Sequence, residues 1–163
     1  MPTTSKTEDI RKELDLLLQG PTSTHHLMSE IVRLLHERMD SYNWVGFYMM
    51  EQQPNGQSPM LVLGPFRGAP TPHTRIPLNQ GICGAAASSG KTVVVNDVAG
   101  DPRYLACSIE TKSEIVVPIY VRGAVVGELD IDSHSPAAFG PRDRELVEYC
   151  AAAVGRRIER SPA

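Results

Sequence analysis

A pair of strand-like segments near the end of the chain constrains its fold more than any other feature. Residues 114–121 and 124–133 are rich in β-branched residues, and only Arg122 and Gly123 separate them. Two such runs joined by a two-residue turn are typical of a β-hairpin. Because the strands of a hairpin are antiparallel, we predict that the sheet built around this pair is mostly antiparallel.

Other periodic segments place helices before and after this hairpin. Apolar residues recur at helical spacing in two early segments, which Gly20 and Pro21 separate, and again near the C-terminus. The predicted elements are, in order, helices over 10–18 and 27–39, a hairpin of 43–50 and 60–66 with a long turn, an extended Pro-rich segment over 69–80, a short helix over 81–90 that Gly90 closes, a strand over 92–95, the hairpin of 114–121 and 124–133, and a helix over 142–160. This order predicts an α+β fold in which helices pack on a mostly antiparallel sheet.

Length and charge exclude several classes of function. A length of 163 residues favours one domain, and 41% hydrophobic and 21% charged residues are typical of an ordinary globular protein. The 16 Lys and Arg against 19 Asp and Glu give a net charge of −3 without a basic run, so nucleic acid is not an expected partner. No apolar run approaches the ~20 residues that cross a bilayer, and the N-terminus lacks the apolar core of a signal peptide, so we expect no membrane association and a cytoplasmic location.

The three cysteines differ in their sequence surroundings. Their odd number and the lack of CxxC spacing predict neither a disulfide framework nor a metal site. Cys150 stands at core spacing on the last predicted helix, where a free thiol behaves as a small hydrophobe. Cys83 stands at the start of a short predicted helix, where free backbone N–H groups stabilise a thiolate, and this favours Cys83 as the reactive thiol. Cys107 lies in the long aperiodic segment 96–112, and loops of this length are usually functional.

Alternating acids mark the last predicted strand. Glu128, Asp130 and Asp132 fall on one face, and apolar residues fall on the other. One interpretation is a half-exposed strand with a solvated polar face. The other is a pocket, in which repulsion and burial raise the pKa of one carboxyl so that it can donate a proton near neutral pH. Glu114, at the start of the preceding strand, is equally ambiguous, because an acid at a strand end is usually solvated.

Two aromatic residues flank a glycine on the first predicted strand. Trp44, Gly46 and Tyr48 share one face, so two large rings border a position without a side chain. Such a gap could seat a small ligand. The alternative is ordinary aromatic core, since Trp and Tyr are commonly buried with their polar ends satisfied.

Six segments occur in a characteristic order along the chain: NWVGFY (43–48), LVLGPFRG (61–68), RIPLNQGICGAAA (75–87), LACS (105–108), SEIVVPI (113–119) and GELDIDS (127–133). In this combination they resemble the free methionine-(R)-sulfoxide reductases, which are single GAF-domain enzymes, over roughly residues 26–158. The resemblance implies one GAF domain over residues 1–163, with an antiparallel sheet of about six strands flanked by N-terminal and C-terminal helices. It also implies an enclosed pocket on one sheet face and a homodimer.

The resemblance further implies an activity and a set of site residues. The family reduces the sulfoxide of free L-methionine and not of protein-bound residues, with an external thiol such as thioredoxin or a small thiol and no other cofactor. Its catalytic cysteine falls on Cys107. Its pocket acids fall on Glu114, Asp130 and Asp132, and its pocket aromatics fall on Trp44 and Tyr48. In this scheme an acid protonates the sulfoxide oxygen, Cys107 attacks the sulfur, and carboxylates hold the ammonium group of the substrate.

The chain departs from the family pattern at the step that regenerates the enzyme. The usual resolving cysteine precedes a VRIP-like segment, and His73 occupies that position here, so the standard disulfide partner is missing. Cys83 matches another cysteine of the family and is the candidate substitute. The alternative functions are a GAF module that senses an amino-acid-like ligand without turnover and a purely structural dimerisation domain.

Overall fold

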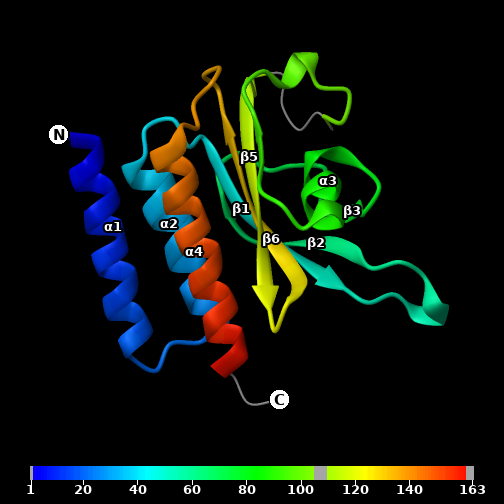
Figure 1. The fold of residues 1–163 in the computed structure, drawn as a ribbon, viewed down its shortest axis with the longest axis horizontal. Helices are drawn as coiled ribbons and strands as arrows, with labels where there is room; N and C mark the ends of the chain where they lie inside the picture. Colours follow the sequence, from blue (N-terminus) through cyan, green and yellow to red (C-terminus); the bar gives the residue numbers. More distant parts are fainter. Residues whose placement is uncertain (1, 105–109, 161–163) are drawn as a thin grey trace.

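The computed structural model describes residues 2–104 and 110–160, and within these ranges a six-stranded sheet is packed between helices (Figure 1). The elements are α1 (Pro2–Gln19), α2 (Thr24–Arg38), β1 (Trp44–Glu51), β2 (Met60–Arg67), β3 (Arg75–Pro77), α3 (Gly81–Ser89), β4 (Val93–Val95), β5 (Ser113–Val121), β6 (Ala124–Ser133) and α4 (Pro141–Arg160). Short 3₁₀ turns lie at Pro54–Gly56 and Val98–Gly100. The predicted α+β class is confirmed.

The sheet is antiparallel throughout its described pairs and has the strand order β3-β2-β1-β6-β5-β4. Both predicted hairpins are present as β1–β2 and β5–β6. At the tip of the second hairpin Arg122 and Gly123 have φ of 51° and 80°, the left-handed pair that a tight two-residue turn needs to match the twist of its strands. β6 lies between β1 and β5, so the alternating acids stand in the middle of the sheet.

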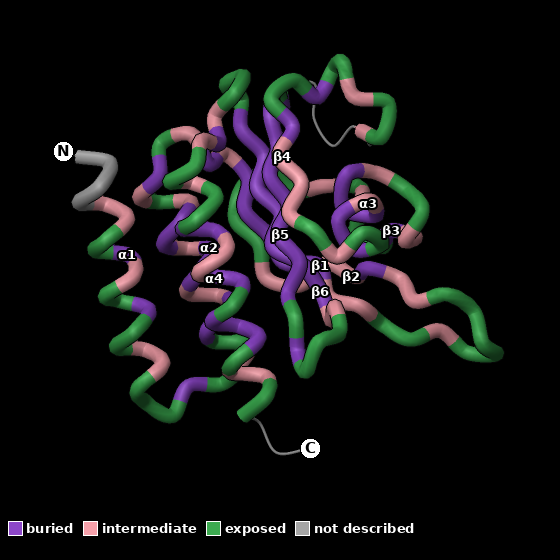
Figure 2. The backbone as a smooth tube through the Cα atoms, in the orientation of Figure 1, coloured by how far each residue is buried: buried purple, intermediate pink, exposed green. Residues whose placement is uncertain are grey.

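One face of the sheet carries the larger hydrophobic core. α2 and α4 cover this face, and α1 packs on the outer side of these two helices (Figure 1). Figure 2 shows α2 and α4 beside the buried strands. Apolar strand residues such as Phe47, Leu129 and Ile131 point into this layer. Cys150 of α4 is fully buried in it, and burial raises the pKa of its thiol to about 12. The expectation of a structural role for Cys150 is therefore supported by its surroundings.

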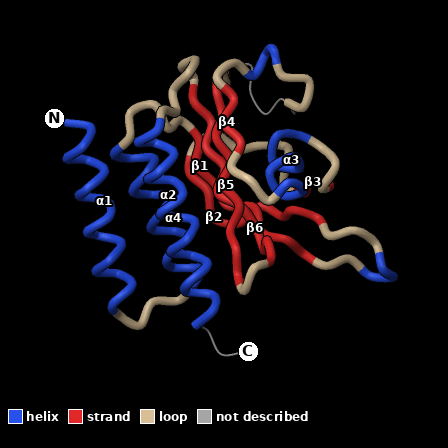
Figure 3. The backbone as a smooth tube through the Cα atoms, in the orientation of Figure 1, coloured by secondary structure: helices blue, strands red, loops and turns tan. Residues whose placement is uncertain are grey.

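The opposite face is covered by α3 and the segments around it (Figure 3). α3 has the predicted position and ends at Gly90, whose φ of 71° is the left-handed conformation of a helix C-cap. Ile82 and Ala86 of α3 pack on Leu61 and Val116 in a second, smaller apolar cluster. The sequence patterns missed β3, which pairs with β2 over only three residues, and the short turn at Val98–Gly100 inside the segment expected to be aperiodic.

None of the helices within the described residues combines the length and the apolar character that crossing a bilayer requires.

Candidate active site

Four carboxyl side chains lie on the sheet face that α3 covers. The strand register sets Glu114 of β5 directly opposite Asp132 of β6, and Asp132 opposite Trp44 of β1. Two residues along β6, Asp130 stands opposite Gly46. Because side chains alternate along a strand, residues at these positions share one face across three strands.

Burial decides between the two interpretations of these acids. Glu114, Glu128, Asp130 and Asp132 expose between 0 and 5% of their surface. The solvated polar face is therefore wrong for this strand, and so is the solvated strand end for Glu114. The acids line an enclosed site under α3.

The acids strongly perturb one another. Burial raises the pKa of each of the four carboxyls. The charges of Asp130 and Asp132 raise the pKa of Glu114 further. Asp130 Oδ1, Asp132 Oδ1 and both Glu128 oxygens are buried without a hydrogen-bond partner among the described atoms. Carboxyls crowded in this way cannot all ionise, so the cluster retains protons near neutral pH.

Cys83 joins the acid cluster from α3. Its Sγ donates a hydrogen bond to Asp130 Oδ2 at 3.3 Å, and the residue is 5% exposed. Burial, followed by the charges of Asp130 and Glu128, raises the pKa of the Cys83 thiol well above its usual range. The expectation that the helix N-terminus makes Cys83 a thiolate is therefore wrong, because burial of the thiol and the nearby carboxylates together outweigh the weaker field of the helix end.

The aromatic pair forms a wall of the site. Trp44 and Tyr48 stack with ring centroids 6.2 Å apart, and Phe66 also stacks with Trp44, with ring centroids 5.8 Å apart. The indole N–H of Trp44 donates to the Ala69 carbonyl at 3.0 Å, and the Tyr48 hydroxyl donates to the His73 carbonyl at 2.6 Å. These two bonds hold the Pro-rich segment after β2 over the edge of the acid cluster.

The space above Gly46 is filled by a side chain of the protein and not by a ligand. A Cβ placed on Gly46 would stand 2.3 Å and 2.8 Å from two ring carbons of Trp44. The indole of Trp44 therefore lies over this position, and the glycine makes room for that ring. The gap does not seat a ligand here.

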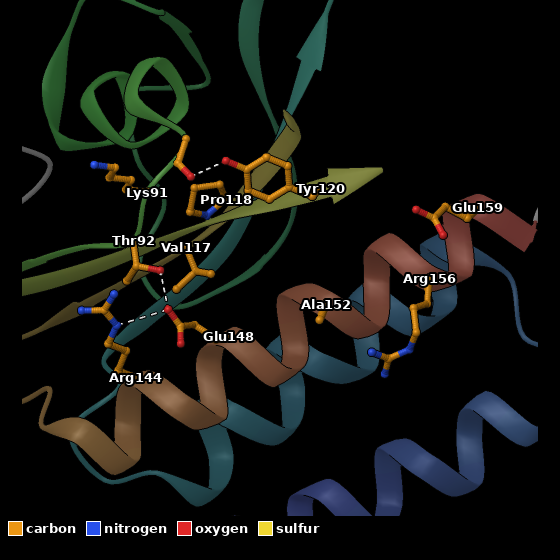
Figure 4. A pocket seen from close by; sticks show the side chains of 11 residues that line it. Lys91, Thr92, Val117, Pro118, Tyr120, Arg144, Glu148, Ala152, Arg156 and Glu159 are labelled. Atoms are coloured by element: carbon orange, nitrogen blue, oxygen red, sulfur yellow. Dashed lines mark hydrogen bonds and ion pairs between the residues drawn. The ribbon is translucent and has the colours of Figure 1, made fainter. Parts of the chain in front are cut away.

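Two small cavities reach the acids from different sides. One of about 100 Å³ is lined by Trp44, Asp132, Thr111 and His134 among others. The other, of about 10 Å³, lies between Tyr48, Cys83, Glu114 and Asp130. A larger hollow of about 600 Å³ lies elsewhere, between α4 and the outer edge of β5 (Figure 4).

Among the described residues that line the larger hollow, none is a candidate site residue. In Figure 4, Glu148 accepts hydrogen bonds from Thr92 at 2.7 Å and from Arg144 at 3.2 Å, and the remaining side chains line an open surface groove. We assign the candidate active site to the two small cavities, because Asp132 lines one of them and Cys83, Glu114 and Asp130 line the other.

Cys107 lies outside the described residues, in the segment 105–109. On its two sides, Tyr104 packs against the smaller apolar cluster and Glu110 lines the cavity beside Trp44. Sequence patterns missed Phe66, the carbonyls of Ala69 and His73, and the unpartnered oxygens of Glu128, because each depends on contacts between distant segments.

Comparison with known proteins agrees with this geometry. The GAF domain family matches residues 23–158. The free methionine-R-sulfoxide reductase of Escherichia coli K12 is 35% identical over 151 residues, which is 91% of this chain and 87% of that protein. The free methionine-R-sulfoxide reductase of Saccharomyces cerevisiae is 39% identical over 115 residues, 70% of this chain and 62% of the yeast protein. A crystal structure of the Neisseria meningitidis free methionine-R-sulfoxide reductase with its substrate superimposes with a TM-score of 0.85 at 33% identity, covering 94% of this chain and 88% of that one.

Proposed function

This chain belongs to the GAF domain family and, within it, to the free methionine-R-sulfoxide reductases, and we propose that it reduces free L-methionine-(R)-sulfoxide with Cys107 as the nucleophile. The observation that carries the assignment of the site is the buried group of Glu114, Asp130 and Asp132 beside an aromatic wall. A module that only senses a ligand has no need for buried carboxyls that retain protons.

The carboxyl cluster suits the first chemical step. A sulfoxide oxygen is a poor leaving group until it is protonated, and a carboxylic acid held neutral by burial can supply that proton. Glu114 and Asp132 are our proposed donors, because they lie opposite each other and Asp132 borders the larger of the two cavities. The thiol of Cys107 then takes the oxygen from the substrate sulfur, so that methionine leaves and Cys107 becomes a sulfenic acid.

The same cluster suits recognition of a free amino acid. Carboxylates attract an ammonium group, and a peptide-bound methionine has none at its own nitrogen. We propose that Asp130 contacts this group as a carboxylate, that Asp132 borders the substrate in its protonated form, and that Trp44 and Tyr48 border the side chain. The modest cavity beside Trp44, about 100 Å³, favours a small substrate over a peptide.

Recycling follows from the residues available. We propose that Cys83 resolves the sulfenic acid: its thiol attacks Cys107, a disulfide forms, and water leaves with the sulfenic oxygen. Asp130, which accepts the hydrogen bond of the Cys83 thiol, is placed to take the proton that this attack releases. A thioredoxin-like protein or a small thiol then reduces the disulfide. We also propose that the protein is a homodimer, that residues 1–163 form one GAF domain, and that the protein works in the cytoplasm, which is a reducing compartment.

Turnover of the separate epimers tests the activity. The protein, incubated with a thiol reductant, is expected to consume free L-methionine-(R)-sulfoxide and to leave the (S) epimer and peptide-bound sulfoxide largely unchanged, as measured by chromatography. Cys107→Ser is expected to abolish turnover. Loss of neither epimer would favour the sensor function, and equal loss of both would remove the stereochemical assignment.

Mass spectrometry after one turnover without reductant tests recycling. A Cys83–Cys107 disulfide is the expected product. A persistent sulfenic acid on Cys107 with Cys83 free would instead assign the second step to an external thiol.

A further inference from the structure

Three donor atoms of the acid cluster are close enough to share one metal ion. The Sγ of Cys83 and carboxylate oxygens of Glu114 and Asp130 lie within 4.8 Å of one another, and all three residues are buried. They come from α3, β5 and β6, so three separate elements hold the donors in place. Sequence spacing alone gave no sign of this group, since its members are distant along the chain.

The cluster also lacks a balancing positive charge. Among the ion pairs of residues 2–104 and 110–160, none includes Glu114, Asp130 or Asp132. Asp130 Oδ1 is buried without a hydrogen-bond partner, as is Asp132 Oδ1 beside it. Buried carboxylate oxygens in this state are stabilised by a cation, and a divalent ion supplies the most charge in the least space.

We propose that this cluster binds one zinc-like divalent cation through Cys83, Glu114 and Asp130. A thiolate with two carboxylates matches the ligands of Zn²⁺ and disfavours Mg²⁺ and Ca²⁺, which prefer oxygen ligands alone. Ligand atoms of a tetrahedral zinc stand roughly 3.5 Å apart, given zinc–sulfur and zinc–oxygen distances of about 2.3 and 2.1 Å. The 3.3 Å between Cys83 Sγ and Asp130 Oδ2 is close to this spacing, and a carboxylate oxygen of Glu114 lies within 4.8 Å of a donor atom on each of these residues.

Binding exchanges protons for the metal. The Cys83 thiol and any protonated carboxyl among the ligands must each release a proton as the cation enters. The cavity of about 10 Å³ that Cys83, Glu114 and Asp130 line together with Tyr48 is the place for the ion. The bound metal occupies acids that the proposed reaction needs, so it is expected to inhibit turnover. This expected inhibition, unlike the binding of the metal, rests on the proposed function.

Cobalt provides a direct test that needs no substrate. Reduced, metal-free protein is titrated with Co²⁺ in the absence of thiol reductants, and a thiolate-to-cobalt charge-transfer absorption is expected to saturate at one equivalent. Zn²⁺ is expected to abolish the band by displacement. Cys83→Ser should remove the band, and both this variant and Glu114→Gln should weaken Zn²⁺ binding at least tenfold by calorimetry, with circular dichroism confirming the fold.

Two cysteine controls make the result decisive. Cys150→Ser is expected to keep the band, because Cys150 lies in the core on the opposite sheet face. Cys107→Ser is also expected to keep it. A band that survives Cys83→Ser, or that disappears in Cys107→Ser, would overturn the proposed ligand set, and so would the absence of any band in the folded wild-type protein. Cobalt binding without reductase activity would contradict the proposed function but not the proposed metal site.

Discussion

Gly46→Ala offers a direct test of how the aromatic wall is built. The new Cβ would stand 2.3 Å and 2.8 Å from ring carbons of Trp44, and non-bonded carbon atoms prefer about 3.5–4.0 Å. β1 is paired on both sides, by β2 and β6, so its backbone cannot retreat easily. The indole must therefore move outward by roughly 1 Å or more.

That movement has a calculable cost. It loosens the hydrogen bond from Trp44 to the Ala69 carbonyl, worth about 1 kcal/mol, and the stacking on Phe66, worth about 0.5–1.5 kcal/mol. Together these agree with the 1–3 kcal/mol that overpacking usually costs, and we expect the free energy of unfolding to fall by about 2 kcal/mol. Because the ring borders the cavity that contains Asp132, KM is expected to rise more than kcat falls.

Urea unfolding measures the loss of stability, and the fluorescence of the chain's one tryptophan reports the displacement of its ring. Steady-state kinetics measures KM and kcat. Gly64→Ala is the matched control in β2, since its new Cβ meets nothing nearer than the Phe47 carbonyl oxygen at 3.5 Å, an ordinary contact. That variant should remain within about 0.5 kcal/mol of the wild type. If Gly46→Ala has wild-type stability and an unshifted Trp44 emission, the ring does not lie over Gly46 and the wall is built differently.

Four further outcomes follow from the acids and thiols. Asp132→Asn and Glu114→Gln are each expected to lower kcat tenfold or more in a folded protein, because an amide cannot supply the acid's proton; wild-type rates in both would remove these residues from the mechanism. Burial raises the pKa of Glu128 in the folded protein. Below about pH 4 the carboxyl is protonated in both the folded and the unfolded state and costs no stability, and as the pH rises the unfolded state is favoured increasingly because its carboxyl can ionise. Thermal unfolding with chelator present should therefore find Glu128→Gln more stable than wild type by about 1–3 kcal/mol at pH 7, with little difference at pH 4; equal stability at both values would contradict the burial of an unpartnered carboxyl. Tyr48→Phe removes the hydrogen bond to the Pro-rich segment and should raise KM with little change in kcat, a split that steady-state kinetics measures. Cys150 should resist thiol reagents in the native protein and react on unfolding, as mass spectrometry would record.

The elements that sequence patterns predict well are those whose signals are local. The β5–β6 hairpin is determined by two long apolar runs and a two-residue turn, and α3 by a short run that ends at Gly90. β3 has only three residues and forms because β2 lies beside it, a partner that no local pattern identifies.

In the candidate site, too, the features with a local sequence signal were predicted and those that depend on distant segments were not. Alternation along β6 correctly placed Asp130 and Asp132 on one face, but their burial depends on α3 and the segment after β2, which cover them from elsewhere in the chain. The error at Cys83 has the same origin. The helix end is visible in the local sequence, whereas the pKa of that thiol is raised by its burial and by the charge of Asp130, which stands 47 residues away.

One face of the sheet carries the core that stabilises the fold, and the other face carries the acids of the candidate site. On the helix-covered face, Phe47, Leu129 and Ile131 are completely buried among apolar neighbours, which is the arrangement that stabilises a domain of this size. On the other face, the same strands hold carboxyls whose burial costs free energy at neutral pH. Because one strand serves both faces, a charge in the site is held as rigidly as the core itself. Substitutions of the acids should therefore separate the two properties, lowering turnover while leaving the free energy of unfolding unchanged or higher.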